Sequence, residues 1–375
     1  MIRSITLQNF KSFGTLQRVP LEPITVLVGP NNSGKSSFMT VGRFVSNLVV
    51  GQGQDAVMQE GDSHFLFHRP YIHAPKHGEN LALGWETDLG STYILELSRS
   101  SRVGAIPSFE EISASEADLT IRFRYPNDFI VRGVQTQNST GDLAPALRFV
   151  VAGEDRRMLS FWQPLAHSRM VKLSLRALRA DSEVVPEPKL TPEGAGLAAV
   201  LGLWRGSRPE KVEELESFLQ KCLPEVRNAL VRPAPTPGHQ RLWLRQRDGE
   251  EFDAEHLSDG VLCFTALTMH AIEAGPGQII FIEEPEHSIH PRRLRELVDL
   301  LKELTLAKKC QFVIATHSPV LLNAFRDEPE AIVLFRRSET GTRVNRLQDI
   351  PLLREALTSA PPGELLESGF FNQDF

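Results

Sequence analysis

Residues 24–36 read I-T-V-L-V-G-P-N-N-S-G-K-S, and this stretch decides how the rest of the chain is interpreted. Its first five residues, Ile24 to Val28, form a continuous apolar run that is typical of a strand buried on both faces. The next eight have the spacing G-x-x-x-x-G-K-S, and residues 37–50 are apolar at helical spacing. A strand, this loop and a helix, in this order, are the context in which such a loop binds phosphate, whereas an isolated Gly-rich turn has no such meaning.

The residue types in this loop match the chemistry of phosphate binding. Gly29 and Gly34 let the backbone N–H groups turn inward around phosphate oxygens. Lys35 supplies a compact cation for the terminal phosphates, and the hydroxyl of Ser36 can ligate magnesium. We therefore predict that the nucleotide is bound by residues of the loop and the first helical turn, namely Asn31, Asn32, Ser33, Gly34, Lys35, Ser36 and Ser37.

A second informative stretch is residues 279–291, I-I-F-I-E-E-P-E-H-S-I-H-P. Ile279 to Ile282 is again typical of a buried strand, and the run ends in the carboxylates of Glu283 and Glu284. In an open parallel sheet, ligands lie outside the carboxyl ends of the strands, which places both glutamates where a nucleotide and its metal would lie. Taken alone, the pair fits an acidic turn better, so its interpretation depends on the rest of the chain.

Two shorter motifs flank this strand in the sequence. L-S-D-G at residues 257–260 opens an apolar helical segment, and Ser258 is suited to cap that helix and leave N–H groups free for an anion. T-H-S-P at residues 316–319 follows a buried strand at Gln311 to Ala315, so His317 projects from a neighbouring strand end, where an imidazole can contact a γ-phosphate. Taken alone, L-S-D-G also fits an ordinary helix cap, and T-H-S-P also fits a histidine with a purely structural role.

The composition excludes several classes of protein. With 375 residues, 41% of them hydrophobic and 23% charged, the chain fits an ordinary globular protein of about two domains. The net charge of -6 gives no global signature of a nucleic-acid binder, and three scattered cysteines fit a reducing compartment. The longest apolar stretch, Gly194 to Trp204, is far shorter than the ~20 residues of a membrane span, and residues 1–10 lack a signal-peptide pattern. We therefore expect a cytoplasmic protein without membrane association.

The patterning divides the chain into three parts. Residues 1–180 form a P-loop lobe, with an antiparallel β subdomain inserted at about 51–155, where short alternating segments are separated by turn residues. Residues 181–250 begin with a Pro- and Glu-rich break and then show short helical patterns, which predicts a helical insertion. Residues 251–375 carry the other three motifs. No heptad pattern is sustained, which excludes a long coiled-coil arm.

In this order the four motifs resemble the nucleotide-binding head of the ABC ATPase superfamily, specifically its soluble branch of SMC, RecF and OLD-type proteins. N-F-K-S-F at residues 9–13 and the continuation E-P-E-H-S-I-H-P look like the OLD and RecF side. The resemblance extends over nearly the whole chain. It implies an α/β fold, an ABC-ATPase head whose P-loop mixed sheet is flanked by helices, with an antiparallel β subdomain and a short helical insertion.

The resemblance also implies ATP and Mg²⁺ as cofactors and a catalytic role for several residues. Glu283 takes the Walker B role and, with Ser36, serves the metal, although the family often has Asp at this position. Glu284 polarises the attacking water. Lys35 and His317 complete the expected catalytic set, with His317 as the switch histidine.

By the same resemblance, L-S-D-G is the signature motif that completes the ATP site of a second copy. Ser258, Asp259 and Gly260 would then contact the nucleotide bound to the partner, so the chain is expected to form a homodimer, or a higher oligomer, through ATP-sandwiched heads. Asp259 departs from the common L-S-G-G form and brings a carboxylate near phosphate.

The implied function is an ATP hydrolase whose ATP-dependent dimerisation controls a partner in defence against phage and plasmids. No D-x-D motif follows Arg336, so we expect a nuclease or toxin effector that is separately encoded. The alternative is a RecF-like repair ATPase, for which DNA is the partner. A transporter ATP-binding subunit is disfavoured by L-S-D-G in place of L-S-G-G-Q, and a non-hydrolysing scaffold by the presence of Glu284.

Overall fold

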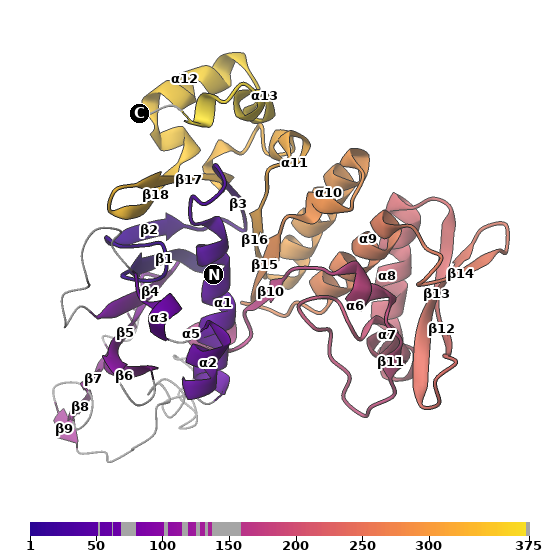
Figure 1. Cartoon of the computed structure of the whole chain (residues 1–375), viewed down its shortest axis with the longest axis horizontal. Helices are drawn as coiled ribbons and strands as arrows, with labels where there is room; N and C mark the ends of the chain where they lie inside the picture. The colour runs from indigo at the N-terminus through magenta and orange to yellow at the C-terminus, as the bar shows by residue number, and fades with distance from the viewer. Residues whose placement is uncertain are drawn as a thin grey trace.

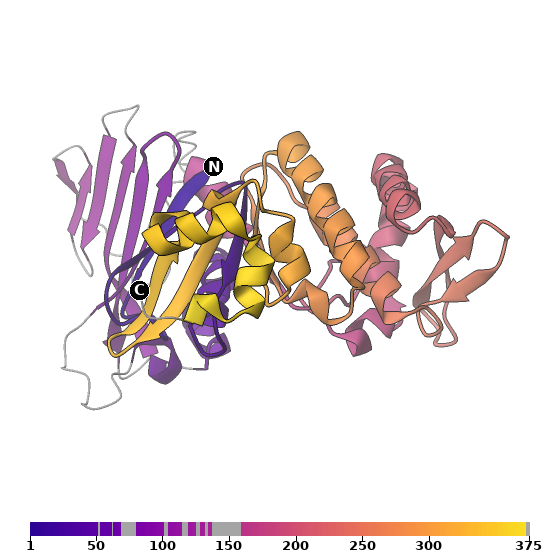
Figure 2. The same cartoon turned by 90° about the horizontal axis from the view of Figure 1, so that it is seen from above.

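The computed structural model describes residues 1–51, 53–61, 63–68, 80–100, 104–114, 119–124, 128–131, 134–136 and 159–372. The molecule is elongated, with an N-terminal sheet at one end, a small sheet at the other, and a central sheet with its helices between them (Figures 1 and 2). Among the described residues, no helix combines the length and the apolar character needed to cross a bilayer.

A six-stranded sheet forms the centre. Its strands follow the order β10 (Arg169–Val171), β15 (Ile279–Glu283), β16 (Gln311–Ala315), β3 (Ile24–Val28), β17 (Ile332–Ser338) and β18 (Gly341–Arg346). The first five are parallel, and β18 pairs antiparallel with β17. Every residue of β3, β15 and β16 is buried, which confirms the buried strands predicted from their apolar runs. Because parallel strands end at one edge, the P-loop, the two glutamates and His317 meet there.

The central sheet separates two hydrophobic cores, because alternate side chains of a strand point to opposite faces. In β15, Ile280 and Ile282 enter one core and Ile279 and Phe281 the other. The first core includes α6 (Leu175–Arg179), α7 (Leu197–Ser207), α8 (Pro209–Cys222), α9 (Asp259–Ile272), α10 (Pro291–Lys308), α11 (Pro319–Asn323), α12 (Pro351–Ser359) and α13 (Pro362–Glu367). The second includes α1 (Lys35–Val50), α2 (Gly53–Gln59), α3 (Ser63–Leu66) and α5 (Leu159–Ala166). Short 3₁₀ turns are η3 (Pro285–His287), η4 (Pro329–Ala331), η5 (Leu347–Asp349) and η6 (Phe370–Asn372).

The antiparallel strands expected within residues 51–155 do not form a sheet of their own. They extend the N-terminal hairpin into an eight-stranded antiparallel sheet in the order β2 (Gln17–Pro20), β1 (Ile2–Gln8), β4 (Leu81–Thr87), β5 (Thr92–Ser100), β6 (Gly104–Ala114), β7 (Leu119–Arg124), β8 (Asp128–Val131) and β9 (Val134–Thr136). The junction is the antiparallel pairing of β1 with β4. The rest of the expected subdomain, including residues 137–158, lies outside the described residues.

The segment 181–250, expected to be helical, contains strands as well as helices α7 and α8. The strands lie in the order β11 (Ser182–Glu183), β13 (His239–Gln246) and β12 (Val226–Pro233), and β14 (Glu251–Asp253) also pairs with β13. The alternating pattern at Arg241 to Arg247, which predicts a strand, corresponds to most of β13. This small sheet lies at the far end of the molecule from the N-terminal sheet (Figure 1).

Gly42 sets the distance between α1 and β15. A methyl group there would overlap the ring of Phe281, which is fully buried. Gly→Ala inside a helix normally stabilises by about 1 kcal/mol, but overpacking a core costs about 1–3 kcal/mol. We therefore expect Gly42→Ala to lower the free energy of unfolding in urea, by about 1 kcal/mol. Gly206→Ala in α7, where the new methyl meets nothing within 4 Å, should raise it instead. If Gly42→Ala and Gly206→Ala stabilised the protein equally, the close packing of α1 on Phe281 would be contradicted.

Candidate active site

The P-loop joins the end of β3 to the start of α1. Gly29 and Gly34 have φ angles of 146° and 105°, and Asn32 has φ of 63°, so three residues of the loop adopt left-handed conformations. Gly34 is the N-cap of α1 without a side-chain cap, which leaves N–H groups of the first turn free for an anion. Ser33 is buried, whereas Asn31 and Asn32 are exposed.

Lys35 lies folded against its own loop. Its Nζ donates to the carbonyl oxygens of Gly29 and Pro30 at 2.7 and 3.1 Å, and only 6% of the residue is exposed. Burial lowers the pKa of Lys35 from 10.5 to about 8, against the opposing effect of three nearby carboxylates, those of Glu284, Glu286 and Glu283. The group is therefore an ammonium at neutral pH, with two carbonyl partners that it can exchange for phosphate oxygens.

The two residues assigned to the metal are in direct contact. Ser36 Oγ donates to Glu283 Oε1 at 2.7 Å, from the first turn of α1 to the last residue of β15. The described residues contain no cluster of three or more His, Cys, Asp or Glu side chains that would cage a metal. A hydroxyl and one carboxylate are nevertheless the donor set that suits Mg²⁺ carried on phosphates, because that ion keeps waters and phosphate oxygens as its other ligands.

Glu284 follows in a conformation that is unusual for its residue type. Its φ and ψ are 49° and 57°, and its N–H donates to the carbonyl oxygen of Ala315 at 2.8 Å, which holds the turn against β16. Left-handed backbone at a residue other than glycine costs on the order of 1–3 kcal/mol and is concentrated at functional sites. The turn directs the carboxylate toward two imidazoles, with His287 Nδ1 at 3.3 Å and His317 Nε2 at 3.8 Å.

His317 is positioned through its backbone. Its N–H donates to Glu286 Oε1 at 2.6 Å, which fixes the strand end of β16 against η3. Burial, and then the ammonium of Lys35, lower the pKa of His317, while the carboxylates of Glu284 and Glu286 oppose that shift. The imidazole is therefore neutral at pH 7 and can act as a hydrogen-bond donor or acceptor.

The signature residues lie apart from this cluster. Ser258 is the exposed N-cap of α9 and accepts from Val261 N at 3.4 Å. The exposed Asp259 is paired with Arg179, whose Nη2 lies 2.6 Å from Asp259 Oδ1. Among the described residues, no hydrogen bond or ion pair joins positions 258–260 to the P-loop or to the glutamates of the same chain.

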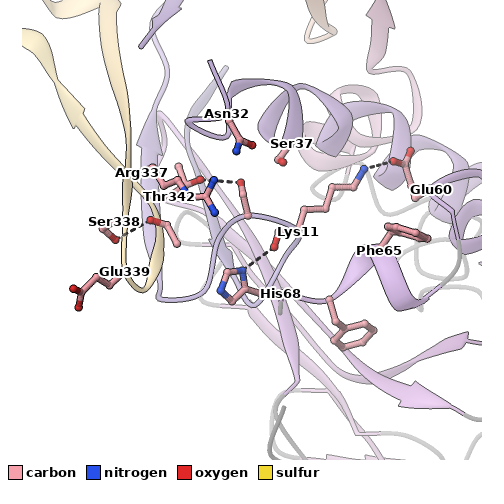
Figure 3. Close-up of a pocket in the computed structure, with 13 residues that line it drawn as sticks. Lys11, Asn32, Ser37, Glu60, Phe65, His68, Arg337, Ser338, Glu339 and Thr342 are labelled. Atoms are coloured by element: carbon pink, nitrogen blue, oxygen red, sulfur yellow. Dashed lines mark hydrogen bonds and ion pairs between the residues drawn. The ribbon is translucent and has the colours of Figure 1, made fainter. Parts of the chain in front are cut away.

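A cavity of about 500 Å³ lies beside the P-loop (Figure 3). Lys11 crosses it and pairs with the buried Glu60, with Nζ 2.5 Å from Oε2, and Arg43 holds the other carboxylate oxygen at 2.8 Å. Phe65 is exposed at one wall, and Asn32 of the P-loop lies at another. The remaining wall includes the turn between β17 and β18. The cavity therefore continues the P-loop toward the N-F-K-S-F loop.

Sequence reasoning missed three features of this site. Glu286 belongs to the quoted stretch, but its bond to the backbone of His317 depends on how η3 packs. The walls of the cavity come from segments up to about 330 positions apart, which no local pattern connects. Lys172 belongs to no motif, yet its Nζ lies 2.8 Å from Glu283 Oε2. The parallel pairing of β10 with β15 brings it there.

Two family models match parts of the chain. Residues 174–323 match a model described as an AAA domain, putative AbiEii toxin, type IV toxin–antitoxin system. Residues 1–49 match an AAA ATPase domain. The second match contains the P-loop, and the first contains the signature residues, both glutamates and His317.

Solved structures of SMC heads have the same fold. The chain is similar to an SMC head bound to the C-terminal winged-helix domain of ScpA, at 13% identity over 92% of this chain and 96% of that chain, with a TM-score of 0.55. It is also similar to the Pyrococcus furiosus Smc head with an extended coiled coil, bound to the C-terminal domain of ScpA, at 12% identity over 95% and 99% of the chains, with a TM-score of 0.52. These likenesses confirm the predicted α/β head fold.

Proposed function

We propose that this chain is an ABC-type ATPase head of the SMC and RecF branch, and that it is an ATP-driven switch that hydrolyses ATP at the edge of its central sheet. The observation that carries the proposal is the contact of Ser36 with Glu283, with Glu284 as the next residue. It brings a phosphate loop, a carboxylate for the metal and a second carboxylate for water to one place. Phosphoryl transfer needs these three elements together.

The nucleotide would lie along the P-loop, with its phosphates at the N-terminus of α1. Its base and ribose would enter the adjoining cavity, where the exposed ring of Phe65 can stack on the base (Figure 3). Lys35 would leave the carbonyl oxygens of Gly29 and Pro30 for the terminal phosphates. This exchange keeps the ammonium partnered throughout.

Hydrolysis would then depend on the two glutamates. Mg²⁺ held by Ser36 Oγ and Glu283 would neutralise charge on the phosphate oxygens and orient them. Glu284 would accept a proton from the attacking water, and its backbone turn fixes where its carboxylate lies. The neutral imidazole of His317 would donate a hydrogen bond to the γ-phosphate.

Dimerisation is supported by the position of the signature residues. Ser258, Asp259 and Gly260 stand at the start of α9, a 14-residue helix with an exposed N-terminal end, and make no contact with the P-loop of their own chain among the described residues. Arg179 forms an ion pair with the carboxylate of Asp259, which reduces its repulsion toward phosphate. We therefore propose that these residues contact the nucleotide of a second copy, which forms a dimer or a higher oligomer.

The Glu284→Gln variant should form dimers with ATP, and adding Ser258→Arg should prevent them, because the long side chain would fill the space of the partner's phosphates. Sedimentation velocity with ATP and with ADP measures the change. Ser359→Arg, at the end of α12, is the matched control, since the Ser359 hydroxyl donates only to Ala356 O in the described structure. A mass that responds to neither the nucleotide nor Ser258→Arg would rule out the sandwiched dimer.

The partner controlled by this switch is proposed to be a separately encoded nuclease or toxin in anti-phage or anti-plasmid defence. The description of the matching family model, a putative AbiEii toxin of a type IV toxin–antitoxin system, supports a defence setting. The SMC heads of similar fold bind another protein, ScpA, which shows that a head can carry a partner. The flanking open reading frames discriminate between the roles, because an adjacent nuclease, reverse transcriptase or toxin gene indicates defence rather than DNA repair.

A further inference from the structure

We propose that Lys172 is an exchangeable counterion of Glu283, a positioning residue that must release this carboxylate before Mg²⁺ can bind there. The inference rests on the proposed function, since it concerns the metal of the same site. Lys172, which lies outside every motif, would then set how much Mg²⁺ the protein needs to hold its nucleotide.

The geometry begins with strand register. β10 and β15 are parallel, and Val171 lies opposite Ile282, so the next residue, Lys172, stands beside Glu283. Lys172 Nζ is 2.8 Å from Glu283 Oε2, while Ser36 Oγ donates to Oε1 at 2.7 Å. Oε1 therefore has a hydrogen-bond donor, whereas Oε2 has a counterion at contact distance but no aligned hydrogen bond. A metal that takes up Glu283 as a ligand must replace the ammonium or share the carboxylate with it.

Sharing is unfavourable because the ammonium and Mg²⁺ are both cations. Two like charges a few ångströms apart on one carboxylate repel each other, and that repulsion is strong where water is excluded. The side chain of Glu283 is only 5% exposed. Lysine and metal are therefore competitors for one buried carboxylate.

The exposures of the two partners decide which side of the ion pair gives way. The side chain of Lys172 is 66% exposed, so its ammonium can return to water at little cost. Glu283 is buried, so its carboxylate needs a cation at all times, since an unpaired buried charge is costly. Within the described part of the chain, Lys172 is the one cation within ion-pair distance of Glu283.

The pair therefore predicts two effects of opposite sign for Lys172→Met, which keeps the length of the side chain and removes the charge. Without nucleotide and Mg²⁺, the variant should be less stable, because Glu283 loses its counterion. With nucleotide, it should need less Mg²⁺, because the competitor is gone. If Lys172 instead bound a phosphate, its removal would weaken nucleotide binding, and Lys172→Met would need more Mg²⁺ rather than less.

The test compares Lys172→Met, Lys172→Arg and Lys221→Met, each in a Glu284→Gln background so that ATP is not consumed. Lys221 is the matched control, since its side chain is 65% exposed and pairs with Glu303 at 3.3 Å, outside the site. Binding of a fluorescent ATP analogue is titrated with Mg²⁺, and melting temperatures are measured in EDTA.

We expect Lys172→Met to lower the half-saturating Mg²⁺ concentration by roughly 3- to 10-fold and to lower the melting temperature in EDTA by a few degrees, as for loss of about one partly buried ion pair. Lys172→Arg and Lys221→Met should keep the Mg²⁺ dependence of the background. An unchanged or higher Mg²⁺ requirement in Lys172→Met would overturn the inference, as would loss of binding at every Mg²⁺ concentration. If the background itself bound the analogue without any Mg²⁺ dependence, the proposed function would fail instead.

Discussion

The Lys35→Ala variant is expected to lose ATP binding while remaining folded. Charge-assisted hydrogen bonds contribute about 1.5–3 kcal/mol each, so the loss of the ammonium should weaken binding by roughly 100-fold or more. The carbonyl oxygen of Pro30, an exposed residue, can be hydrated when it loses its donor, whereas that of Gly29 is buried, so the variant should also be less stable by about 1–3 kcal/mol. Isothermal titration calorimetry with Mg²⁺ and ATP measures the change in Kd directly.

A matched control separates a binding defect from a folding defect. Lys211→Ala removes another partly buried ammonium, which pairs with Glu273 at 2.6 Å far from the P-loop. This variant should be less stable than the parent but should bind ATP with the parental Kd. In thermal melts, ATP should still raise the melting temperature of Lys211→Ala and should no longer raise that of Lys35→Ala. Parental affinity in Lys35→Ala would remove the basis for placing phosphate on this loop.

The parts of the site that the sequence predicts are those encoded by contiguous residues. The strand Ile24 to Val28, the loop after it and helix α1 form a local unit, so their residue pattern alone indicates their arrangement. The position of His317 beside the glutamates is harder to predict from sequence, because it depends on the pairing of β16 with β15. The structure has this pairing. Both predictions use strand ends in a parallel sheet, where topology restricts the choices.

The parts that could not be predicted depend on pairing between distant segments. β10 has only three residues, too few for a recognisable pattern, yet its register with β15 places Lys172 on Glu283. The antiparallel strands after residue 80 show clear alternation, but alternation does not reveal that β4 pairs with β1 rather than forming a separate sheet. No local pattern connects Arg179 with Asp259, 80 positions later, yet the structure pairs them.

The Glu284→Gln variant is expected to bind ATP with the parental affinity and to hydrolyse it about 10²- to 10⁴-fold more slowly, the range for loss of a positioned general base. Glutamine keeps the size of the side chain and can occupy the same turn, held by the backbone bond to Ala315. Its amide cannot accept the proton of the attacking water. Steady-state phosphate release measures turnover, and calorimetry shows whether binding is preserved.

The neighbouring carboxylate supplies the control for this substitution. Glu286 lies two positions after Glu284. Its Oε1 accepts a hydrogen bond from the backbone N–H of His317, and the carbonyl oxygen of a glutamine side chain can accept the same bond. Glu286→Gln should therefore reduce turnover by less than about tenfold, since it preserves this hydrogen bond. Equal losses of turnover in Glu284→Gln and Glu286→Gln would mean that the rate depends on the total negative charge of the site and not on Glu284 in particular. A parental rate in Glu284→Gln would show that another group positions the water. A large loss in Glu284→Gln alone assigns the proton to the residue that the αL turn directs toward His317.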